Sequence, residues 1–183
     1  MVKTISGKMA EFASSLKWDE IPENAINETK RFLLDSMGCA LAAVKFEDML
    51  AMQRYIEFLG GTEQATLIGS GVKTNAANAG LMNGLLIRAL DYNDIYWEQD
   101  PSHPSDMIGA ALACAELNQK SGKEALIAIL IGYELEMRWC HAASPGIREV
   151  GWHHASLTQF VSPLVAGRLC NLNEDQMVSA IGI

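Results

Sequence analysis

Apolar residues recur along this chain at intervals of three and four, the spacing that gathers them on one face of an α-helix. The first segment with this spacing carries Ile5, Met9, Phe12 and Leu16. Residues 65–68 form the one convincing strand-like run, and a run of that length is too short to found a sheet. The pattern therefore predicts an all-α fold of seven or eight helices.

The expected helices follow one another with short connections. They cover residues 5–16, 23–41, 47–59, 75–87, 104–115, 123–140 and 158–169. The segment 75–87 is rich in alanine and glycine, and small residues let neighbouring helices approach closely, so we expect it to be a buried central helix. Pro163 lies inside the segment 158–169 and predicts a kink or a late start there, because proline removes a helical hydrogen bond.

A helix start near the end of the sequence bears on the domain organisation. Asn173 and Gln176 fit a capping box, in which each side chain accepts the backbone N–H of the other residue. The helix that begins there reaches Ile183 without a polar cap. We therefore expect residues 1–183 to be the N-terminal part of a longer helical domain, truncated at its C-terminus.

Composition and charge exclude several classes of protein. Apolar residues make up 49% of the chain, which rules out intrinsic disorder as a description of the whole. The net charge of −8 disfavours general binding to nucleic acid, because a phosphate backbone repels an acidic surface. The most apolar stretch, residues 125–133, is too short to cross a membrane. No secretory signal pattern is visible at the N-terminus, so we expect a cytoplasmic protein.

The cysteines give no sign of a metal or a disulfide framework. Cys39, Cys114, Cys140 and Cys170 are far apart in the sequence, each within an apolar helical pattern. This placement predicts reduced, buried thiols. Because no two cysteines have the Cys-x-x-Cys spacing, a zinc ribbon or a locally encoded iron–sulfur site gets little support.

A first cluster of reactive side chains lies in the polar segment 91–106. It contains Asp91, Asp94, His103 and Asp106, and it follows a helix that is nearly free of charge. Histidine with a carboxylate beside it suits proton transfer near neutral pH, and loops on a rigid scaffold often carry such groups. The competing interpretation is ordinary capping, in which these polar side chains satisfy the free N–H groups of the next helix.

A second cluster contains His153 and His154 just before the segment 158–169. Successive side chains of an extended segment point to opposite sides, so we expect only one of the two histidines to face a pocket. Arg148 lies nearby and is a candidate for pairing with an anionic substrate. A solvated loop charge is an equally good interpretation of Arg148.

The same residue types that suit proton transfer can also bind a metal ion. Two histidines and a carboxylate can hold a divalent ion, and His103, His153 and Asp91 are the available set. They come from separate loops without the spacing of known ligand motifs, so we expect no metal. Gly69 and Gly71 are a lone glycine pair without the rest of a phosphate loop, which disfavours nucleotide binding.

Taken in order, several stretches of the chain resemble the MmgE/PrpD family, which includes 2-methylcitrate dehydratases and cis-aconitate decarboxylases. They are LDSMGCA at 34–40, ALDYND at 89–94, HPSD at 103–106, GWH at 151–153, NEDQ at 173–176 and AIGI at 180–183. The resemblance covers the whole chain but only the first part of the family pattern. It implies an all-α domain completed by later helices, and a smaller α+β lid domain that this sequence lacks.

The resemblance also implies a lyase that needs no cofactor, acts on small tricarboxylates and forms a homodimer. The two aspartates of the family's D-x-x-D segment fall on Asp91 and Asp94. The family's histidines fall on His103 and His153, and His154 stands where the family often has proline. Ile95 stands where the family commonly has threonine, which removes a hydroxyl from the edge of the pocket.

These observations together predict a lyase of the 2-methylcitrate dehydratase type, without cofactor or metal. Removal of water from a hydroxy acid needs a base beside a carboxylate and an acid for the departing hydroxyl. The expected catalytic residues are Asp91, His103 and His153, and the expected substrate-binding residues are Asp94, Ile95 and Arg148. A decarboxylase acting on cis-aconitate, an epimerase acting on a related acid, and a non-catalytic helical fragment are the competing hypotheses.

Overall fold

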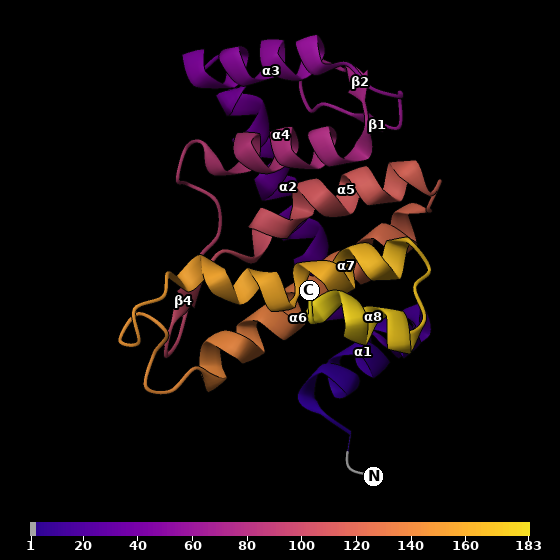
Figure 1. Ribbon diagram of the computed structural model, residues 1–183, viewed down its shortest axis with the longest axis vertical. Helices are drawn as coiled ribbons and strands as arrows, with labels where there is room; N and C mark the ends of the chain where they lie inside the picture. The colour runs from indigo at the N-terminus through magenta and orange to yellow at the C-terminus, as the bar shows by residue number, and fades with distance from the viewer. Residues whose placement is uncertain (1–2) are drawn as a thin grey trace.

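The structure is a computed structural model that describes residues 3–183 (Figure 1). Within these residues it contains eight α-helices: α1 Ile5–Ser15, α2 Glu23–Ala43, α3 Glu47–Leu59, α4 Ala76–Arg88, α5 Ile108–Leu117, α6 Gly122–Ala142, α7 Ser162–Leu169 and α8 Glu174–Ile181. Three short 3₁₀ helices accompany them: η1 Trp18–Glu20, η2 Pro104–Met107 and η3 His154–Phe160. The prediction of an all-α fold is confirmed.

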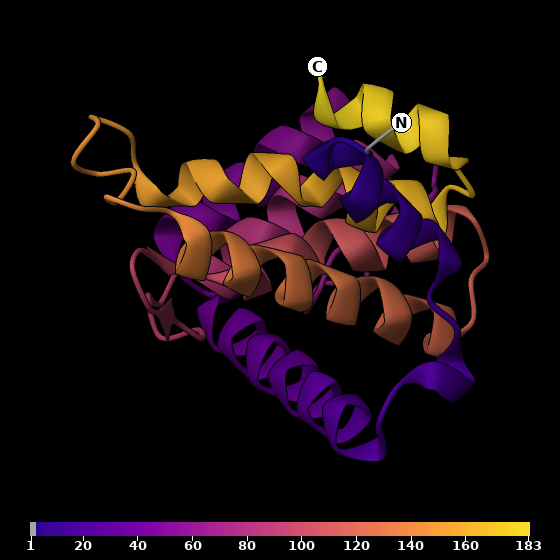
Figure 2. The same ribbon diagram turned by 90° about the horizontal axis from the view of Figure 1, so that it is seen from below.

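Most helices are stacked in rows, and the long helix α2 packs across several of them. Figure 1 shows α3, α4, α5, α7 and α8 as successive rows, with α2 running across behind them. Figure 2 shows α2 along one side of the molecule, with α6 in the middle and α1 beside α8 at the opposite side. Residues far apart in the sequence therefore meet, as Lys3 and Glu174 do in an ion pair of 2.7 Å.

Caps and prolines set several helix boundaries as the sequence indicates. Asn75 caps α4 by accepting the N–H of Asn78, and Asn173 with Gln176 forms the predicted capping box of α8. The segment around Pro163 has a late start, because α7 begins at Ser162 after η3 ends. Ser121 is the N-cap of α6, again in a capping box.

The strand content differs slightly from the prediction of one strand-like run. Residues 65–68 contribute only β1 Ala65–Thr66, which pairs with β2 Lys73–Thr74. A second small hairpin, β3 Tyr96–Trp97 with β4 Pro101–Ser102, lies in the polar segment between α4 and η2. Two-residue strands give no periodic signal, so the sequence pattern could not reveal β2, β3 and β4.

Small residues allow a very close helix contact in the core, between α4 and α5. A Cβ built on Gly109 of α5 would lie 2.4 Å from the backbone nitrogen of Gly84 and 2.9 Å from the carbonyl oxygen of Gly80, both on α4. The alanine- and glycine-rich helix is therefore central, as expected. The contact also matters for the site, because η2 leads directly into α5 and packs against α4 near Gly84.

The thiols only partly follow the prediction. Cys39 and Cys140 are buried, Cys114 is half-buried, and Cys170, just after α7, is exposed. The prediction that all four are buried was therefore wrong for Cys170, which lies at a helix end rather than on its inner face. No helix of the described part of the chain combines the length and the hydropathy needed to span a bilayer.

Candidate active site

The end of α4 carries the first residues of the site. Arg88 is the last residue of α4, and its guanidinium forms an ion pair of 3.0 Å with Asp91. Asp91 has a φ of 49°, a left-handed conformation that aspartate tolerates better than most residues. The Asp91 side chain is 80% exposed, so its carboxylate is accessible from solvent.

A buried amide joins the end of α4 to η2. The Asn93 carbonyl oxygen accepts a hydrogen bond of 3.1 Å from Arg88, and its amide donates one of 2.8 Å to the hydroxyl of Ser105. The Asp94 carboxylate accepts the backbone N–H of Ser105 at 3.3 Å. Burial raises the pKa of Asp106, whose carboxylate also lies 3.4 Å from the Asn93 amide. The polar segment is thus folded back onto η2.

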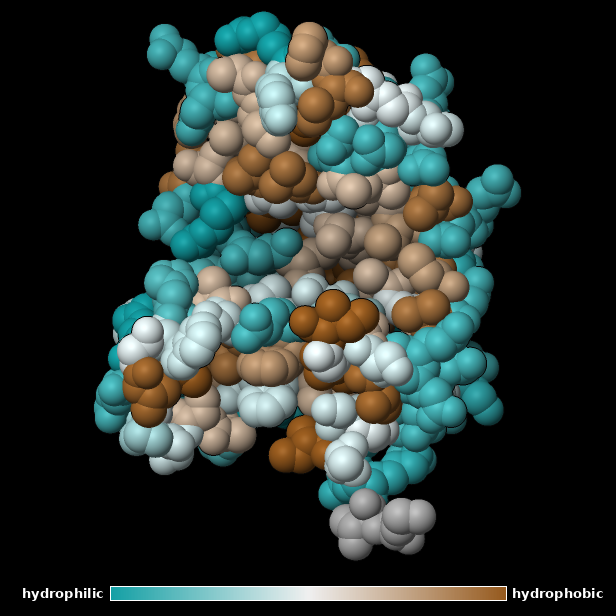
Figure 3. All heavy atoms as spheres, in the orientation of Figure 1, coloured by the Kyte–Doolittle hydropathy of each residue, from teal (hydrophilic) through white to brown (hydrophobic). Residues whose placement is uncertain are grey.

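Arg88 and Asp106 line a shallow depression on the surface. Its volume is about 290 Å³, and its other lining residues are Gly80, Leu81, Gly84 and Leu85 of α4. Figure 3 shows the face to which α4 and α5 belong, hollowed across its middle and lined there largely by apolar atoms. A depression with an apolar floor and an arginine at its edge suits a small molecule that carries both alkyl and carboxylate groups.

His103 has its proton positions set by the backbone. The side chain is 8% exposed, and its Nδ1 lies 2.6 Å from the carbonyl oxygen of Asp94. Because a carbonyl oxygen only accepts hydrogen bonds, Nδ1 must be the protonated nitrogen. In the neutral ring Nε2 then carries the lone pair, and it is the atom that can accept a proton.

His154 has the opposite tautomer. Its Nδ1 lies 2.9 Å from the guanidinium of Arg148, which only donates, so Nδ1 accepts and Nε2 carries the proton. Burial, followed by the charge of His153, lowers the pKa of His154 to about 4 and keeps the ring neutral. The ring centroids of His103 and His154 are 5.6 Å apart. Two imidazoles with complementary tautomers therefore lie side by side.

His153 is exposed, and its ring centroid is 4.1 Å from that of His154. The expectation that the two rings point apart assumed an extended segment. His153 is instead the N-cap of η3, where its Nδ1 accepts the N–H of Ala155 at 3.2 Å, and His154 is the first residue of η3. The turn into the 3₁₀ helix brings both rings to the same place.

The structure brings some of the predicted site residues together and leaves others apart. Asp94 contacts His103, and both His153 and Arg148 contact His154, which in turn adjoins His103. Asp91 and Ile95 are exposed, Ile95 with 52% of its surface accessible. Asp91 and Ile95 can therefore contribute to the active site only if the ligand extends over the outer surface of the segment 91–106.

Sequence reasoning missed three residues that the structure places at the site. Arg88 supplies a cation, Asn93 bridges Arg88 to η2, and Glu136 of α6 lies buried behind the histidines. The sequence does contain a signal for two of these three residues. Arg88 is the single charge on a helix of small and apolar residues, and Glu136 interrupts the apolar face of residues 123–140.

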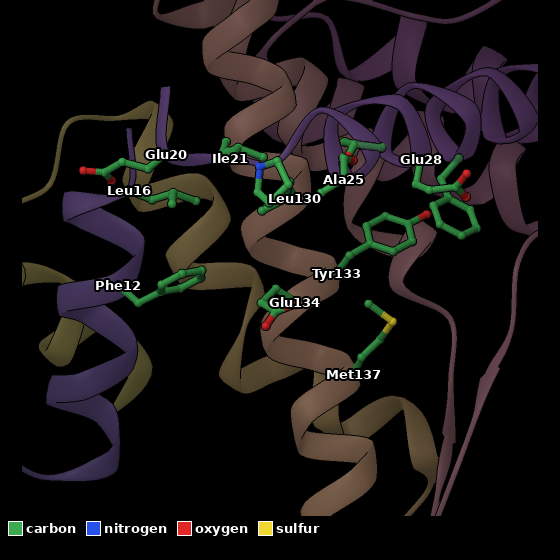
Figure 4. Close-up of a pocket in the computed structure, with 13 residues that line it drawn as sticks. Phe12, Leu16, Glu20, Ile21, Ala25, Glu28, Leu130, Tyr133, Glu134 and Met137 are labelled. Carbon is green, nitrogen blue, oxygen red and sulfur yellow. The ribbon is translucent and has the colours of Figure 1, made fainter. Parts of the chain in front are cut away.

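A larger cavity of about 410 Å³ lies elsewhere, between α1, α2 and α6 (Figure 4). Its lining is apolar and aromatic, with Phe12 and Tyr133 on opposite sides. The charged side chains that line it, Glu20, Glu28 and Glu134, are all acidic. Such a cavity repels a carboxylate ligand, whereas the histidine cluster has Arg88 and Arg148 beside it. Within residues 3–183, no group of three or more His, Cys, Asp or Glu side chains has a metal-binding arrangement.

Comparison with known proteins identifies similar chains. Residues 7–183 match the model of the MmgE/PrpD N-terminal domain. The chain is 28% identical over 171 residues to the "Probable 2-methylcitrate dehydratase" of Saccharomyces cerevisiae, covering 86% of this chain and 33% of that protein. It is 25% identical over 182 residues to the 2-methylcitrate dehydratase of Escherichia coli, covering 90% of this chain and 36% of that protein.

A third similar protein carries the name of a different activity. The cis-aconitate decarboxylase of Aspergillus terreus is 25% identical over 191 residues, covering 98% of this chain and 38% of that protein. The chain thus spans between 33% and 38% of the length of these three curated relatives.

Proposed function

This chain belongs to the MmgE/PrpD family, and from that premise we propose that its protein removes water from a small tricarboxylate of the 2-methylcitrate type. The observation that carries the proposal is the hydrogen bond from His103 Nδ1 to the Asp94 carbonyl oxygen. It fixes a tautomer in which Nε2 is a proton acceptor. We assign catalysis to Asp91, His103 and His153, and substrate binding to Asp94, Ile95 and Arg148.

In the proposed reaction a C–H bond beside a carboxylate breaks and its proton passes to Nε2 of His103. The electron pair of that bond forms the new carbon–carbon double bond, and the C–O bond to the hydroxyl breaks. Protonation of the departing hydroxyl releases water and leaves the unsaturated tricarboxylate. His153 is the exposed group from which we expect this second proton, and the exposed Asp91 carboxylate is the group that can accept a proton beside it, since both are accessible to a ligand.

The substrate's negative charge calls for cations near the histidines. Arg88 and Arg148 are the two guanidiniums beside them, held by Asn93 and His154 respectively. A guanidinium can bind a carboxylate through two parallel hydrogen bonds, which orients as well as attracts it. Because three carboxylates need more positive charge than two arginines at the rim provide, we propose that further cations come from outside residues 1–183.

A decarboxylase is the second candidate, because the similarity to the cis-aconitate decarboxylase of Aspergillus terreus covers 98% of this chain, at 25% identity. A decarboxylase releases carbon dioxide, whereas a dehydratase releases water and forms a double bond. An epimerase acting on a related acid would release neither molecule and would only invert a carbon centre, and a non-catalytic helical fragment would leave every acid unchanged. The four hypotheses therefore differ in products that can be measured directly.

The test is an assay of the complete gene product with 2-methylcitrate, citrate and cis-aconitate. We expect formation of the unsaturated acid from 2-methylcitrate, measured by its ultraviolet absorbance, without release of carbon dioxide. Replacement His103→Ala should lower the rate by about 10²–10⁴-fold, the usual effect of losing a general base. Carbon dioxide from cis-aconitate would favour the decarboxylase, and no turnover of any of the three acids would contradict the proposal.

We also propose that this activity needs no metal and that the complete protein is a homodimer. The cysteines are dispersed and the histidines lie on separate loops, so neither set has ligand spacing. Exhaustive chelation should leave the rate unchanged, and light scattering should give twice the mass of one chain. Loss of activity on chelation that one divalent ion restores would overturn the metal-free mechanism.

A further inference from the structure

A carboxyl group lies buried behind the histidine pair. Glu136, in the middle of α6, is 0% exposed. Its Oε1 accepts hydrogen bonds from the hydroxyls of Ser102 and Thr158, the latter at 2.9 Å. Its Oε2 has no hydrogen-bond partner among the described residues. No ion pair of the described residues involves Glu136 either.

Packing alone does not account for this carboxyl group. An apolar side chain of similar volume would fill the same space, whereas a buried polar atom without a partner is unfavourable. Burial, opposed by the two hydroxyls and assisted by the charges of Asp106 and Asp94, raises the pKa of Glu136 to about 7. The buried carboxyl group therefore lowers the stability of the fold. This cost indicates that its two hydrogen bonds serve another purpose.

The two hydroxyl partners lie next to the two histidines. Ser102 ends β4 and directly precedes His103. Thr158 lies on η3, the 3₁₀ helix that begins at His154. A single oxygen atom thus joins the two segments that carry the imidazoles, which come from parts of the chain about fifty residues apart.

Other hydrogen bonds hold the β3–β4 hairpin to the neighbouring elements. The backbone N–H of Asp100 donates to the Cys140 carbonyl oxygen at 3.2 Å, and the Asp100 carboxylate accepts the N–H of Ile147. These bonds hold the β3–β4 hairpin to the end of α6 and to the loop that follows. They do not reach η3. Among the hydrogen bonds of the described residues, those to Glu136 are the ones that link β4 to η3, two elements that also pack against each other.

We propose that Glu136 is a positioning residue that sets the relative placement of the His103 and His154 rings without touching the substrate. The consequence for catalysis rests on the proposed function, but the positioning itself does not. The carboxyl oxygen fixes β4 and η3 against α6, and the two rings follow from their backbone positions. Loss of the oxygen frees two hydroxyls and lets the segments move apart.

The experiment compares two replacements in the complete gene product, with histidine ring signals followed by NMR. Glu136→Gln keeps one carbonyl oxygen for both hydroxyls, so the ring signals of His103 and His154 should stay close to their wild-type positions. Glu136→Leu keeps the apolar volume but removes the oxygen, so both signals should shift. In the assay Leu should lower kcat by about 10²-fold, the effect of a misplacement of about 1 Å, while Gln restores it.

Two single-hydroxyl variants keep the test decisive if Glu136→Leu does not fold. Ser102→Ala should shift the His103 signal most, and Thr158→Val should shift the His154 signal most. Thr74→Val is the matched control, because Thr74 is buried on β2 and its hydroxyl donates to the Gly60 carbonyl oxygen at 3.3 Å, on elements that carry none of the histidines. It removes a buried hydroxyl of the same kind and should move neither signal.

The inference is overturned if the ring signals are unchanged in the folded Leu variant, or if Thr74→Val moves them as much as Ser102→Ala and Thr158→Val do. An absence of turnover in the wild-type protein would contradict the proposed function and leave the NMR comparison fully informative. A changed KM with unchanged kcat and unchanged ring signals would place Glu136 in substrate binding and would also contradict a positioning role.

Discussion

At the scale of single residues, the surroundings of each imidazole decide which of its nitrogens is available. The Asp94 carbonyl oxygen fixes the proton on Nδ1 of His103, and Arg148 fixes it on Nε2 of His154. Neither contact is the one that the sequence predicts. Asp94 acts through its main chain, and Arg148 acts on the histidine that the family resemblance leaves without a role.

The two adjacent histidines make the first prediction at this scale. Replacement His153→Ala in the complete protein should lower kcat by about 10²–10⁴-fold, because His153 is the exposed member of the pair and a candidate acid. His154→Ala should leave kcat closer to wild type, and His141→Ala, at the exposed end of α6, is the control. A large loss in His154→Ala with a silent His153→Ala would reverse the assignment.

The second prediction concerns substrate choice at Ile95. A hydroxyl at this position would add one hydrogen bond, of about 0.5–1.5 kcal/mol, to an oxygen of the substrate. The isoleucine instead offers apolar surface to a methyl branch, about 0.8 kcal/mol for each buried methylene. Ile95→Thr should therefore lower the ratio of kcat/KM for 2-methylcitrate over citrate. An unchanged or higher ratio would mean that Ile95 faces away from the substrate.

The third prediction concerns the pH dependence of stability through Glu136. Its pKa is about 7 in the folded protein and about 4.5 when unfolded, so between these values the folded state binds the extra proton. The free energy of unfolding should therefore fall as the pH rises from about 4.5 to 7, by roughly 3 kcal/mol at most. Denaturation of Glu136→Gln and wild type across this range measures the effect.

His154 titrates in an overlapping range with the opposite sign, since its lowered pKa makes the folded state bind fewer protons. It is present in both proteins, so its contribution cancels in their difference. The advantage of the Gln variant should grow with pH and level off above about 7. A difference that does not change with pH would show that the Glu136 carboxyl ionises normally.

At the scale of elements, the contact between α4 and α5 holds η2 beside Arg88. The fourth prediction is that Gly109→Ala destabilises the fold by about 1–3 kcal/mol or more, because the added Cβ would meet the α4 backbone at 2.4 Å. Gly38→Ala is the matched control: Gly38 lies within α2, with no atom within 4 Å of the added Cβ.

Alanine favours a helix over glycine by about 0.5–1 kcal/mol, so Gly38→Ala should be neutral or stabilising. Chemical denaturation of the two variants, with the site followed by the histidine signals, checks both expectations. Equal stability of the two variants would mean that α4 and α5 are farther apart than the glycine contact requires.

At the scale of the whole molecule, the chain spans between 33% and 38% of the length of three curated relatives. The fifth prediction is that residues 1–183 alone show no turnover of 2-methylcitrate or cis-aconitate. The physical reason is charge: the cations beside the histidine cluster, Arg88 and Arg148, are too few to neutralise a tricarboxylate. Turnover by the isolated segment that His103→Ala abolishes would contradict this.

The sequence by itself determined the local structure, because helix signals act over a few residues. The apolar spacing of three and four, the capping pairs such as Asn173 with Gln176, and Pro163 place the helices, and the family motifs select His103 and the aspartates. The strand-like run at 65–68 located β1, but β2, β3 and β4 could not be predicted, because two-residue strands have no period.

The tertiary structure alone decided which of these groups meet. Glu136 interrupts an apolar helix face in the sequence, but only the folded chain buries it between Ser102 and Thr158, each more than twenty residues away. The tautomers of His103 and His154 likewise depend on a carbonyl and a guanidinium brought in by chain folding. Burial and hydrogen-bond geometry are properties of the packed chain, and no local pattern encodes them.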